Sequence, residues 1–260
     1  MTTGTATKLW ALDGAKFTLD RSILVVGGTG EIHIPVPTYL IQHPRGLVLF
    51  DTGIAPSAVE DPEGTYGELA SLVGLDFSAE MRVDRQIEAV GFSASDVTHV
   101  IVSHSHFDHT GGLSLFPNAR FYIGEPDLAY AYWPMPAASP FFRTADIEPA
   151  RGFDWHPVSG DLDLFGDGAI QMLAMPGHTP GNTATLVRLP NRVVMLTGDT
   201  VHVPEAFTDD LPMASDYSTL DAVRSIRRMK QIAHAHDADV IIQHDFDGWN
   251  RLKKLGEALS

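Results

Sequence analysis

Short apolar runs separated by glycine, proline and acidic turn residues recur along the chain, a pattern typical of β-strands. Residues 8–26 predict two strands joined by a turn. Residues 34–41 and 46–50 predict a hairpin whose second strand ends at Asp51, and the prolines at positions 35 and 37 indicate that its first strand begins at a sheet edge. Further strands are predicted at residues 98–102, 119–123, 158–164, 169–174, 183–189, 192–197 and 240–242.

Apolar residues at helical spacing predict helices at residues 82–90, 125–132 and 220–235. Residues 55–75 and 133–150 are rich in turn residues and are predicted to be loops. Because strand-rich halves are each followed by helices, the pattern favours two sheets packed face to face with helices outside. The chain has no linker and no repeat at a fixed short period, and we expect residues 1–260 to form one domain.

Three histidines and an aspartate lie within six residues, directly after the apolar run 100–102. Imidazole nitrogen and carboxylate oxygen suit Zn²⁺ and neighbouring first-row metals. Alternate side chains of a short loop point in different directions, so four ligands cannot surround one ion. We therefore expect His104 and His106 on one ion and Asp108 and His109 on a second. A surface loop that merely happens to be rich in histidine is the alternative, which the concentration of such groups disfavours.

The sequence H-x-H-x-D-H-T-G-G at residues 104–112 resembles the signature of the metallo-β-lactamase superfamily. The resemblance implies an α+β protein with a four-layer αββα fold and a two-metal hydrolase. Further matches extend from residue 8 to about residue 250. In detail the chain resembles the quorum-quenching N-acyl-homoserine lactonases more than the β-lactamases or glyoxalases II.

Three more residues match ligands of that superfamily. His178, flanked by glycine after a predicted strand, matches the P-G-H-T-x-G element and is expected to complete the first metal site. Asp199 matches the bridging ligand, since a carboxylate can join two cations that lie ~3.5–4 Å apart. His244 is expected to complete the second site. Taken alone, His178 and Asp199 would be ordinary loop and turn residues. The implied cofactor is two Zn²⁺ per chain, with Fe, Mn or Co as possible substitutes.

The resemblance also assigns roles around the metals. Asp51 is similar to the superfamily's buried aspartate that accepts a hydrogen bond from a metal-bound histidine. A hydroxide that bridges the metals is expected to attack the carbonyl carbon, and Asp108 to shuttle the proton to the leaving oxygen. His202 stands where well-known homoserine lactonases have a tyrosine, three residues after the bridging aspartate. An imidazole can donate a hydrogen bond there, although a plain loop residue is an equal alternative.

The substrate pocket is predicted around residues 25–34, with Ile34, Phe107, Phe141 and Phe142 as substrate-binding residues. Aromatic loop residues suit a substrate with an apolar part, although such residues also occur in cores and interfaces. The sequence does not distinguish a monomer from a homodimer.

Composition excludes several classes of function. The chain has no cysteine, which rules out disulfides, thiolate ligands and cysteine nucleophiles, and with them the β-lactamase branch that uses a cysteine ligand. A net charge of −15 argues against nucleic acid and anionic membrane surfaces as partners. No signal peptide pattern and no membrane-spanning apolar run is found, so we expect a cytoplasmic protein that acts on a small molecule.

Three functions compete. The first is hydrolysis of N-acyl-homoserine lactones. The second keeps the site and changes the substrate, to another lactone of the 4-pyridoxolactone or γ-butyrolactone type or to a thioester as in glyoxalase II. The third is a non-hydrolytic member of the fold, such as a diiron flavoprotein partner or a metal-binding regulator. Such members usually replace a histidine of the first site by a carboxylate, and position 106 is His.

Overall fold

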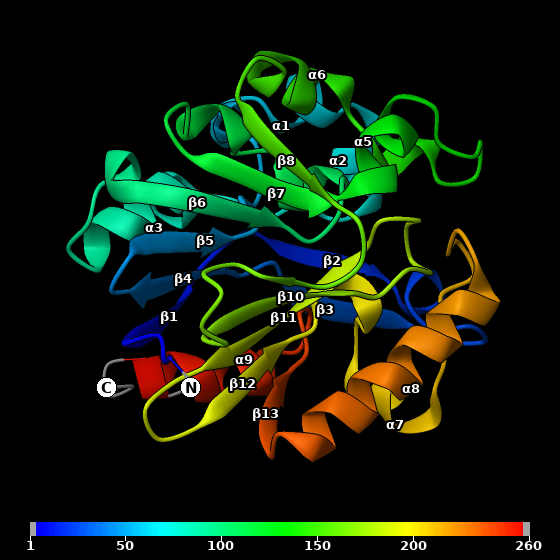
Figure 1. Cartoon of the computed structure of the whole chain (residues 1–260). Helices are drawn as coiled ribbons and strands as arrows, with labels where there is room; N and C mark the ends of the chain where they lie inside the picture. Colours follow the sequence, from blue (N-terminus) through cyan, green and yellow to red (C-terminus); the bar gives the residue numbers. More distant parts are fainter. Residues whose placement is uncertain (1–3, 257–260) are drawn as a thin grey trace.

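Two large β-sheets pack face to face in the computed structural model, which describes residues 4–256 (Figure 1). The first sheet has the order β1-β4-β5-β6-β7-β8 and the second β13-β12-β11-β10-β9, while β2 and β3 form a separate hairpin. The strands are β1 (Lys8–Leu12), β2 (Lys16–Asp20), β3 (Glu31–Pro35), β4 (Thr38–His43), β5 (Gly46–Phe50), β6 (Val97–Val102), β7 (Arg120–Gly124), β8 (Asp154–Val158), β9 (Leu162–Asp163), β10 (Ile170–Ala174), β11 (Thr183–Arg188), β12 (Val193–Leu196) and β13 (Ala238–Ile241).

Helices cover the outer faces of the two sheets (Figure 1). Helices α5 and α6 lie beyond the first sheet, α8 lies beyond the second, and α9 contacts β1 and β13. The helices are α1 (Pro62–Tyr66), α2 (Glu68–Leu72), α3 (Val83–Ala89), α4 (Phe107–Thr110), α5 (Glu125–Tyr132), α6 (Thr144–Ile147), α7 (Pro204–Asp209), α8 (Thr219–Ala235) and α9 (Phe246–Gly256). The expected α+β class and four-layer αββα arrangement are confirmed.

The strand periodicity distributes side chains over separate cores. Tyr39 and Ile41 of β4 lie in the core between the sheets, with residues of β11 and β12. Leu40 between them faces the outer core that α3 and α5 cover. Because successive side chains of a strand point to opposite faces, a strand covered on both faces reads as one apolar run. This explains the run Leu47–Phe50, which is buried along its length.

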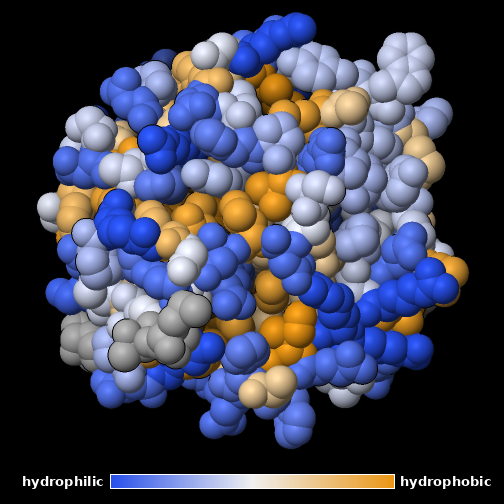
Figure 2. Space-filling model, in the orientation of Figure 1, coloured by the Kyte–Doolittle hydropathy of each residue, from blue (hydrophilic) through white to orange (hydrophobic). Residues whose placement is uncertain are grey.

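The most regular predicted elements are confirmed. The hairpin β4–β5 is antiparallel as expected, and so is β11–β12. Helices α3, α5 and α8 occupy the predicted ranges to within two residues. None of the described helices is both long enough and apolar enough to cross a membrane. On the face shown in Figure 2 hydrophilic side chains predominate, in keeping with the acidic composition.

Pairing of the first strands differs from the prediction. β1 and β2 are consecutive, yet β1 pairs with β4 and β2 with β3. The predicted strand 34–41 is divided between β3 and β4 at Pro35 and Pro37. β4 lies between β1 and β5, so this part of the predicted strand is not at a sheet edge, whereas Ile34 and Pro35 lie in β3 of the two-stranded sheet, where each strand has a free edge. Pro35 ends β3 opposite Lys16, and Pro37 lies in the link before β4, so neither proline interrupts the ladder of β4.

Three other assignments need correction. The predicted strand 158–164 contains only the last residue of β8 and the two-residue β9, which pairs with β10. β8 tolerates Pro157 because it is the outermost strand of its sheet. β13 is also an edge strand and only Ile241 is fully buried in it, against the predicted buried strand. Short helices occupy parts of the predicted loops 55–75 and 133–150. Helices α7 and α9 were not predicted, although Trp249 and Leu252 bury one face of α9 at helical spacing.

Candidate metal centre

The ends of parallel strands from both sheets meet at one edge of the sandwich. β5, β6 and β7 run parallel, so the residues that follow β5 and β6 emerge together. Asp51 follows β5, and the loop of His104 follows β6. In the second sheet β12 and β13 are parallel, and Asp199 and His244 follow them closely. The fold therefore collects polar groups that lie far apart in the sequence.

All seven predicted ligands are buried and fall into two groups. The ligand atoms within each group lie within 4.8 Å of one another. The first group is His104, His106, His178 and Asp199, and the second is Asp108, His109 and His244. The other six residues are grouped as the sequence suggested, and Asp199, which was expected between the two ions, falls in the first group.

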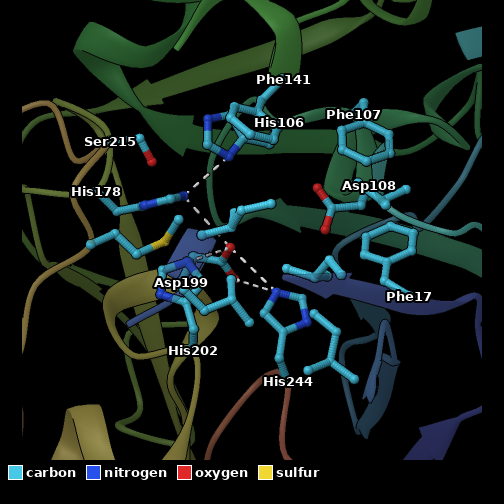
Figure 3. A pocket seen from close by; sticks show the side chains of 16 residues that line it. Phe17, His106, Phe107, Asp108, Phe141, His178, Asp199, His202, Ser215 and His244 are labelled. Carbon is cyan, nitrogen blue, oxygen red and sulfur yellow. Dashed lines mark hydrogen bonds and ion pairs between the residues drawn. The ribbon is translucent and has the colours of Figure 1, made fainter. Parts of the chain in front are cut away.

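Distances within the first group suit one small cation. Nδ1 of His106 lies 3.1 Å from Nε2 of His178, which lies 3.6 Å from Oδ2 of Asp199 (Figure 3). Nε2 of His104 lies 3.8 Å from the same oxygen. Ligand atoms around a tetrahedral ion with bonds of ~2.0–2.1 Å are roughly 3.3 Å apart. The observed separations scatter around this value.

The other oxygen of Asp199 faces the second group. Oδ1 lies 3.4 Å from Nε2 of His109 and 3.3 Å from Nε2 of His244. Nε2 of His109 lies 3.5 Å from Oδ2 of Asp108. Because Nε2 of His244 also lies 3.4 Å from Oδ2, the carboxylate of Asp199 as a whole lies between the two groups, as a ligand shared between two ions would.

Several buried ligand atoms that face the site have no hydrogen-bond partner in the described part of the chain and are placed to bind metal ions instead. Among the described residues, Nε2 of His104, Nε2 of His109 and Oδ1 of Asp199 are buried without a hydrogen-bond partner. An unsatisfied buried polar group costs about 1–3 kcal/mol. Three such atoms converging on one place are explained if cations occupy it.

Hydrogen bonds on the far side of the rings orient the histidines. Nδ1 of His109 lies 2.8 Å from Oδ2 of Asp51, and Nδ1 of His244 lies 2.8 Å from the carbonyl oxygen of Pro35. Nδ1 of His178 lies 2.9 Å from Oδ1 of Asp216. Each bond fixes a ring so that Nε2 points inward. The sequence analysis missed Asp216, since no spacing signal links it to a histidine 38 residues earlier.

Asp51 adopts an unusual backbone conformation to reach its partner. Its φ is 61°, in the left-handed region that few residues other than glycine adopt. Besides His109, its carboxylate accepts hydrogen bonds from the backbone N–H and the hydroxyl of Ser103, at 2.7 and 2.9 Å. The strained turn therefore ties the end of β5 to the start of the ligand loop.

Asp127 joins the two loops that carry the first ligand group. Its buried carboxylate accepts bonds from the N–H and hydroxyl of Ser105, both at 2.7 Å, and from the N–H of Gly181 at 2.8 Å. Ser105 stands between His104 and His106, and Gly181 follows His178. The sequence analysis did not select Asp127, because its position at the start of α5 gives no sign of these contacts.

Protonation of the site favours metal binding in the first group. Burial, and then the neighbouring histidines, hold the pKa of His104 and of His106 well below the ordinary value. Burial alone would raise the pKa of Asp199, but the surrounding imidazoles lower it well below its usual range. Metal binding requires neutral imidazole and ionised carboxylate, which these shifts supply.

The two histidines of the second group, His109 and His244, differ from His104 and His106 in this respect, because the pKa of each is raised above the ordinary value. Burial alone would lower the pKa of His109, but the carboxylates of Asp108, Asp199 and Asp51 together raise it well above the ordinary value. A cation that binds here has to displace a proton, so binding at the second group becomes pH-dependent.

His202 lies in the site without belonging to either group. Its buried Nε2 is 3.1 Å from Oδ2 of Asp199, yet it is not aligned to donate to that oxygen or to any other described atom. Burial lowers the pKa of His202, and Asp199 offsets only part of this shift. His202 therefore adds a buried imidazole to the edge of the site, with its Nε2 beside Asp199. His234 and His236 lie apart from the site, at the end of α8.

A pocket with mainly apolar walls opens onto the two groups (Figure 3). Of the four predicted substrate-binding residues, Ile34, Phe107 and Phe141 line it. Phe142 does not line it; its ring packs 4.5 Å from that of His106 and 5.2 Å from that of Tyr130. The ring of Phe141 packs on the same imidazole, 5.5 Å from that of His106, so both neighbouring rings contact His106 but only Phe141 lines the pocket.

Comparison with known proteins gives consistent matches along most of the chain. Residues 33–241 match the family model of the metallo-β-lactamase superfamily. The N-acyl homoserine lactonase AttM of Rhizobium radiobacter is 34% identical over 236 residues, 89% of each chain. An N-acyl homoserine lactonase of Bacillus cereus is 29% identical over 249 residues, 94% of this chain and 95% of the relative.

Solved structures agree with these relatives. An N-acyl homoserine lactone hydrolase with the product N-hexanoyl-L-homoserine bound at its catalytic metal centre superposes with a TM-score of 0.83 and 26% identity, covering 95% of this chain and 96% of that one.

Proposed function

Because the chain belongs to the metallo-β-lactamase superfamily, we propose that it is a dinuclear metal-dependent hydrolase that opens the ring of N-acyl-homoserine lactones. The curated relatives, similar over most of the chain, support a hydrolase that acts on lactone ester bonds. One observation carries the proposal: the carboxylate of Asp199 lies between two buried ligand groups and contacts both, at the base of a mainly apolar pocket.

The proposed cofactor is two Zn²⁺, for which Fe, Mn or Co could substitute. His104, His106 and His178 would hold the first ion, Asp108, His109 and His244 the second, and Asp199 both. When bound, two such cations supply a nucleophilic hydroxide near neutral pH and polarise an ester carbonyl.

Asp108 and His202 are the proposed catalytic side chains. In ring opening, hydroxide adds to the carbonyl carbon, the ring C–O bond breaks, and the leaving alkoxide takes a proton. Asp108, which lines the pocket beside His109, would carry that proton on its carboxylate. His202 would donate a hydrogen bond from its unpartnered Nε2 to an ester oxygen that gains charge.

Substitution of His202 tests its role separately from metal binding. His202→Phe keeps an aromatic ring and removes the donor, so kcat should fall by more than KM rises, while the metal content stays the same. An unchanged kcat would return His202 to the status of an ordinary wall residue.

The pocket walls favour a substrate with an apolar tail. Phe17, Phe107 and Phe141 surround the approach to the metals, and rings of this size exclude water and bury an acyl chain. The second candidate remains another lactone, of the 4-pyridoxolactone or γ-butyrolactone type, and the observation that favours it is His202 in the place of the family's tyrosine. We also propose that residues 1–260 form one domain, because a core shared by both sheets joins the described parts of the chain.

Acid release in weakly buffered solution tests the function directly. The panel comprises short- and long-chain N-acyl-homoserine lactones, simple γ- and δ-lactones, 4-pyridoxolactone, a glutathione thioester and a β-lactam, each with and without prior chelation. We expect chelator-sensitive opening of the acyl-homoserine lactones with kcat/KM above ~10⁴ M⁻¹s⁻¹, the ordinary range for a native substrate.

Two other outcomes contradict parts of the proposal. Turnover of another ring without the acyl-homoserine lactones would keep the site chemistry and assign the second candidate. Turnover that chelation leaves unchanged would overturn the metal-dependent mechanism.

A further inference from the structure

Ser215 is a polar lining residue of the pocket without an evident role at the metals. The other polar side chains among the described lining residues are five of the proposed ligands and His202, which faces Asp199. Within the described part of the chain, no partner is found for the half-buried Ser215 hydroxyl. Figure 3 places Ser215 on the same side of the pocket as His178, with Phe107 and Phe17 on the opposite side.

The loop that carries Ser215 is anchored to the loop of His178. The N–H of Tyr217 donates to the carbonyl oxygen of His178 at 3.1 Å, and the N–H of Ser218 donates to that of Gly177 at 3.0 Å. The carboxylate of Asp216 binds Nδ1 of His178 through Oδ1 and accepts the N–H of Met213 through Oδ2, at 2.9 and 2.8 Å. Ser215 is thus held at a fixed place relative to a proposed ligand of the first metal.

The proposed substrate brings one polar group that the metals do not bind. An N-acyl-homoserine lactone carries an amide between its ring and its acyl chain, and this amide must leave water when the chain enters the apolar pocket. Burial of an amide is unfavourable unless the amide finds a hydrogen-bond partner in the protein. A serine hydroxyl can both donate to the amide oxygen and accept from the amide N–H.

We propose that Ser215 determines specificity by hydrogen bonding the amide of the substrate, held in place by the contact of Asp216 with His178. The inference rests on the proposed function and extends it. The metals, Asp108 and His202 would contact the ester of the ring. The apolar wall of the pocket would contact the acyl chain. Through this hydrogen bond, Ser215 makes the enzyme prefer lactones with an amide over lactones that carry a plain alkyl chain.

The experiment compares two substrates of equal length on the metal-loaded enzyme. One is N-hexanoyl-homoserine lactone, and the other is a γ-lactone with an alkyl chain in place of the acylamino group. Ser215→Ala should lower the ratio of their kcat/KM values by about 3- to 10-fold, the range of one neutral hydrogen bond. Ser159→Ala, at an exposed loop serine outside the pocket, should leave the ratio unchanged. Ser215→Thr, which retains the hydroxyl, should keep most of the wild-type ratio of the two kcat/KM values.

Binding of the ring-opened products by calorimetry gives a second measurement that does not depend on turnover. Ser215→Ala should weaken the amide-bearing product and spare the alkyl product, with the metal content unchanged. Equal losses on both compounds, or no loss on either, would overturn the role of Ser215 while the lactonase proposal stands. A wild-type enzyme that opens neither lactone would overturn the proposed function, and this inference with it.

Discussion

Three of the proposed ligand histidines, His109, His178 and His244, are oriented by a hydrogen bond on the far side of the ring. The partners differ chemically: Asp51 and Asp216 are carboxylates, whereas His244 relies on the carbonyl oxygen of Pro35. A carboxylate makes the ring more basic and a stronger ligand than a carbonyl does. Residues that touch no metal therefore contribute to metal affinity.

Removal of one ligand is the most direct test at this scale. His106→Ala should lose metal from the first group and lower kcat/KM by more than about 100-fold, because loss of a ligand's partner alone costs about 10- to 100-fold. Metal analysis and kinetics measure both effects, and circular dichroism should show the fold retained. His234→Ala, at an exposed histidine at the end of α8, is the control. Full activity in His106→Ala would exclude the proposed site.

A buried carboxyl group near the ligand loop makes stability depend on pH. Burial raises the pKa of Asp146 to about 6, and Arg143, 3.7 Å away, offsets only part of the shift. The folded protein keeps this proton up to about pH 6, whereas the unfolded chain releases it near 3.8. Stability is therefore lost as the pH rises through this window and stays lower above it.

Asp146→Asn removes this ionisation. At pH 8 the variant should be more stable than the wild type by about 1–3 kcal/mol, since one pKa unit corresponds to about 1.4 kcal/mol. The difference should shrink toward pH 4. Urea unfolding with chelator present measures it without interference from metal release. A variant that is less stable at pH 8, or a difference independent of pH, would contradict the prediction.

Two elements approach each other closely where the ligand loops are joined. A Cβ added to Gly124, at the end of β7, would lie 2.0 Å from the carbonyl oxygen of Gly181. The junction of β7 and α5 thus packs directly on the loop that follows His178. This contact lets Asp127, in the first turn of α5, reach Ser105 and Gly181 together.

Gly124→Ala should separate these elements. We expect a loss of about 1–3 kcal/mol in the free energy of unfolding, the usual cost of overpacking, together with weaker metal binding. Gly152→Ala is the matched control, because a Cβ there meets nothing within 4 Å. Urea unfolding and metal titration give both quantities. Equal behaviour of the two variants would show that the close approach is not required.

At the scale of the whole molecule, the site connects the two halves of the sandwich. One sheet contributes the loop of His104, and the other contributes Asp199 and His244. Cations at this junction would neutralise buried carboxylates from both sheets. Metal binding should therefore stabilise the packing of the sheets and not only the loops.

Chelation should lower the melting temperature of the whole domain in one transition. A ligand at ~100–1,000 times its dissociation constant stabilises by about 3–4 kcal/mol, which corresponds to roughly 6–16 °C for a chain of this size. Calorimetry before and after chelation, with metal content measured, tests this, and Zn²⁺ should reverse the loss. An unchanged melting temperature in protein proven free of metal would contradict the linkage between site and fold.

The sequence alone determined the local features, because periodicity and side-chain chemistry are properties of short segments. The apolar runs predicted most strands, the helical stripe predicted α8, and the density of ligands at 104–109 predicted the division into two groups that the structure shows.

The tertiary structure decided what depends on the path of the chain between segments. Pairing of β1 with β4 rather than with β2 follows from how the sheets stack, since both pairings suit the same alternation. Phe141 lines the pocket and Phe142 does not, although both rings pack on His106, and no periodicity in the sequence distinguishes two adjacent phenylalanines at the end of a short helical turn. Asp216 meets His178 across 38 residues, where only the packing of two loops brings the carboxylate to the ring.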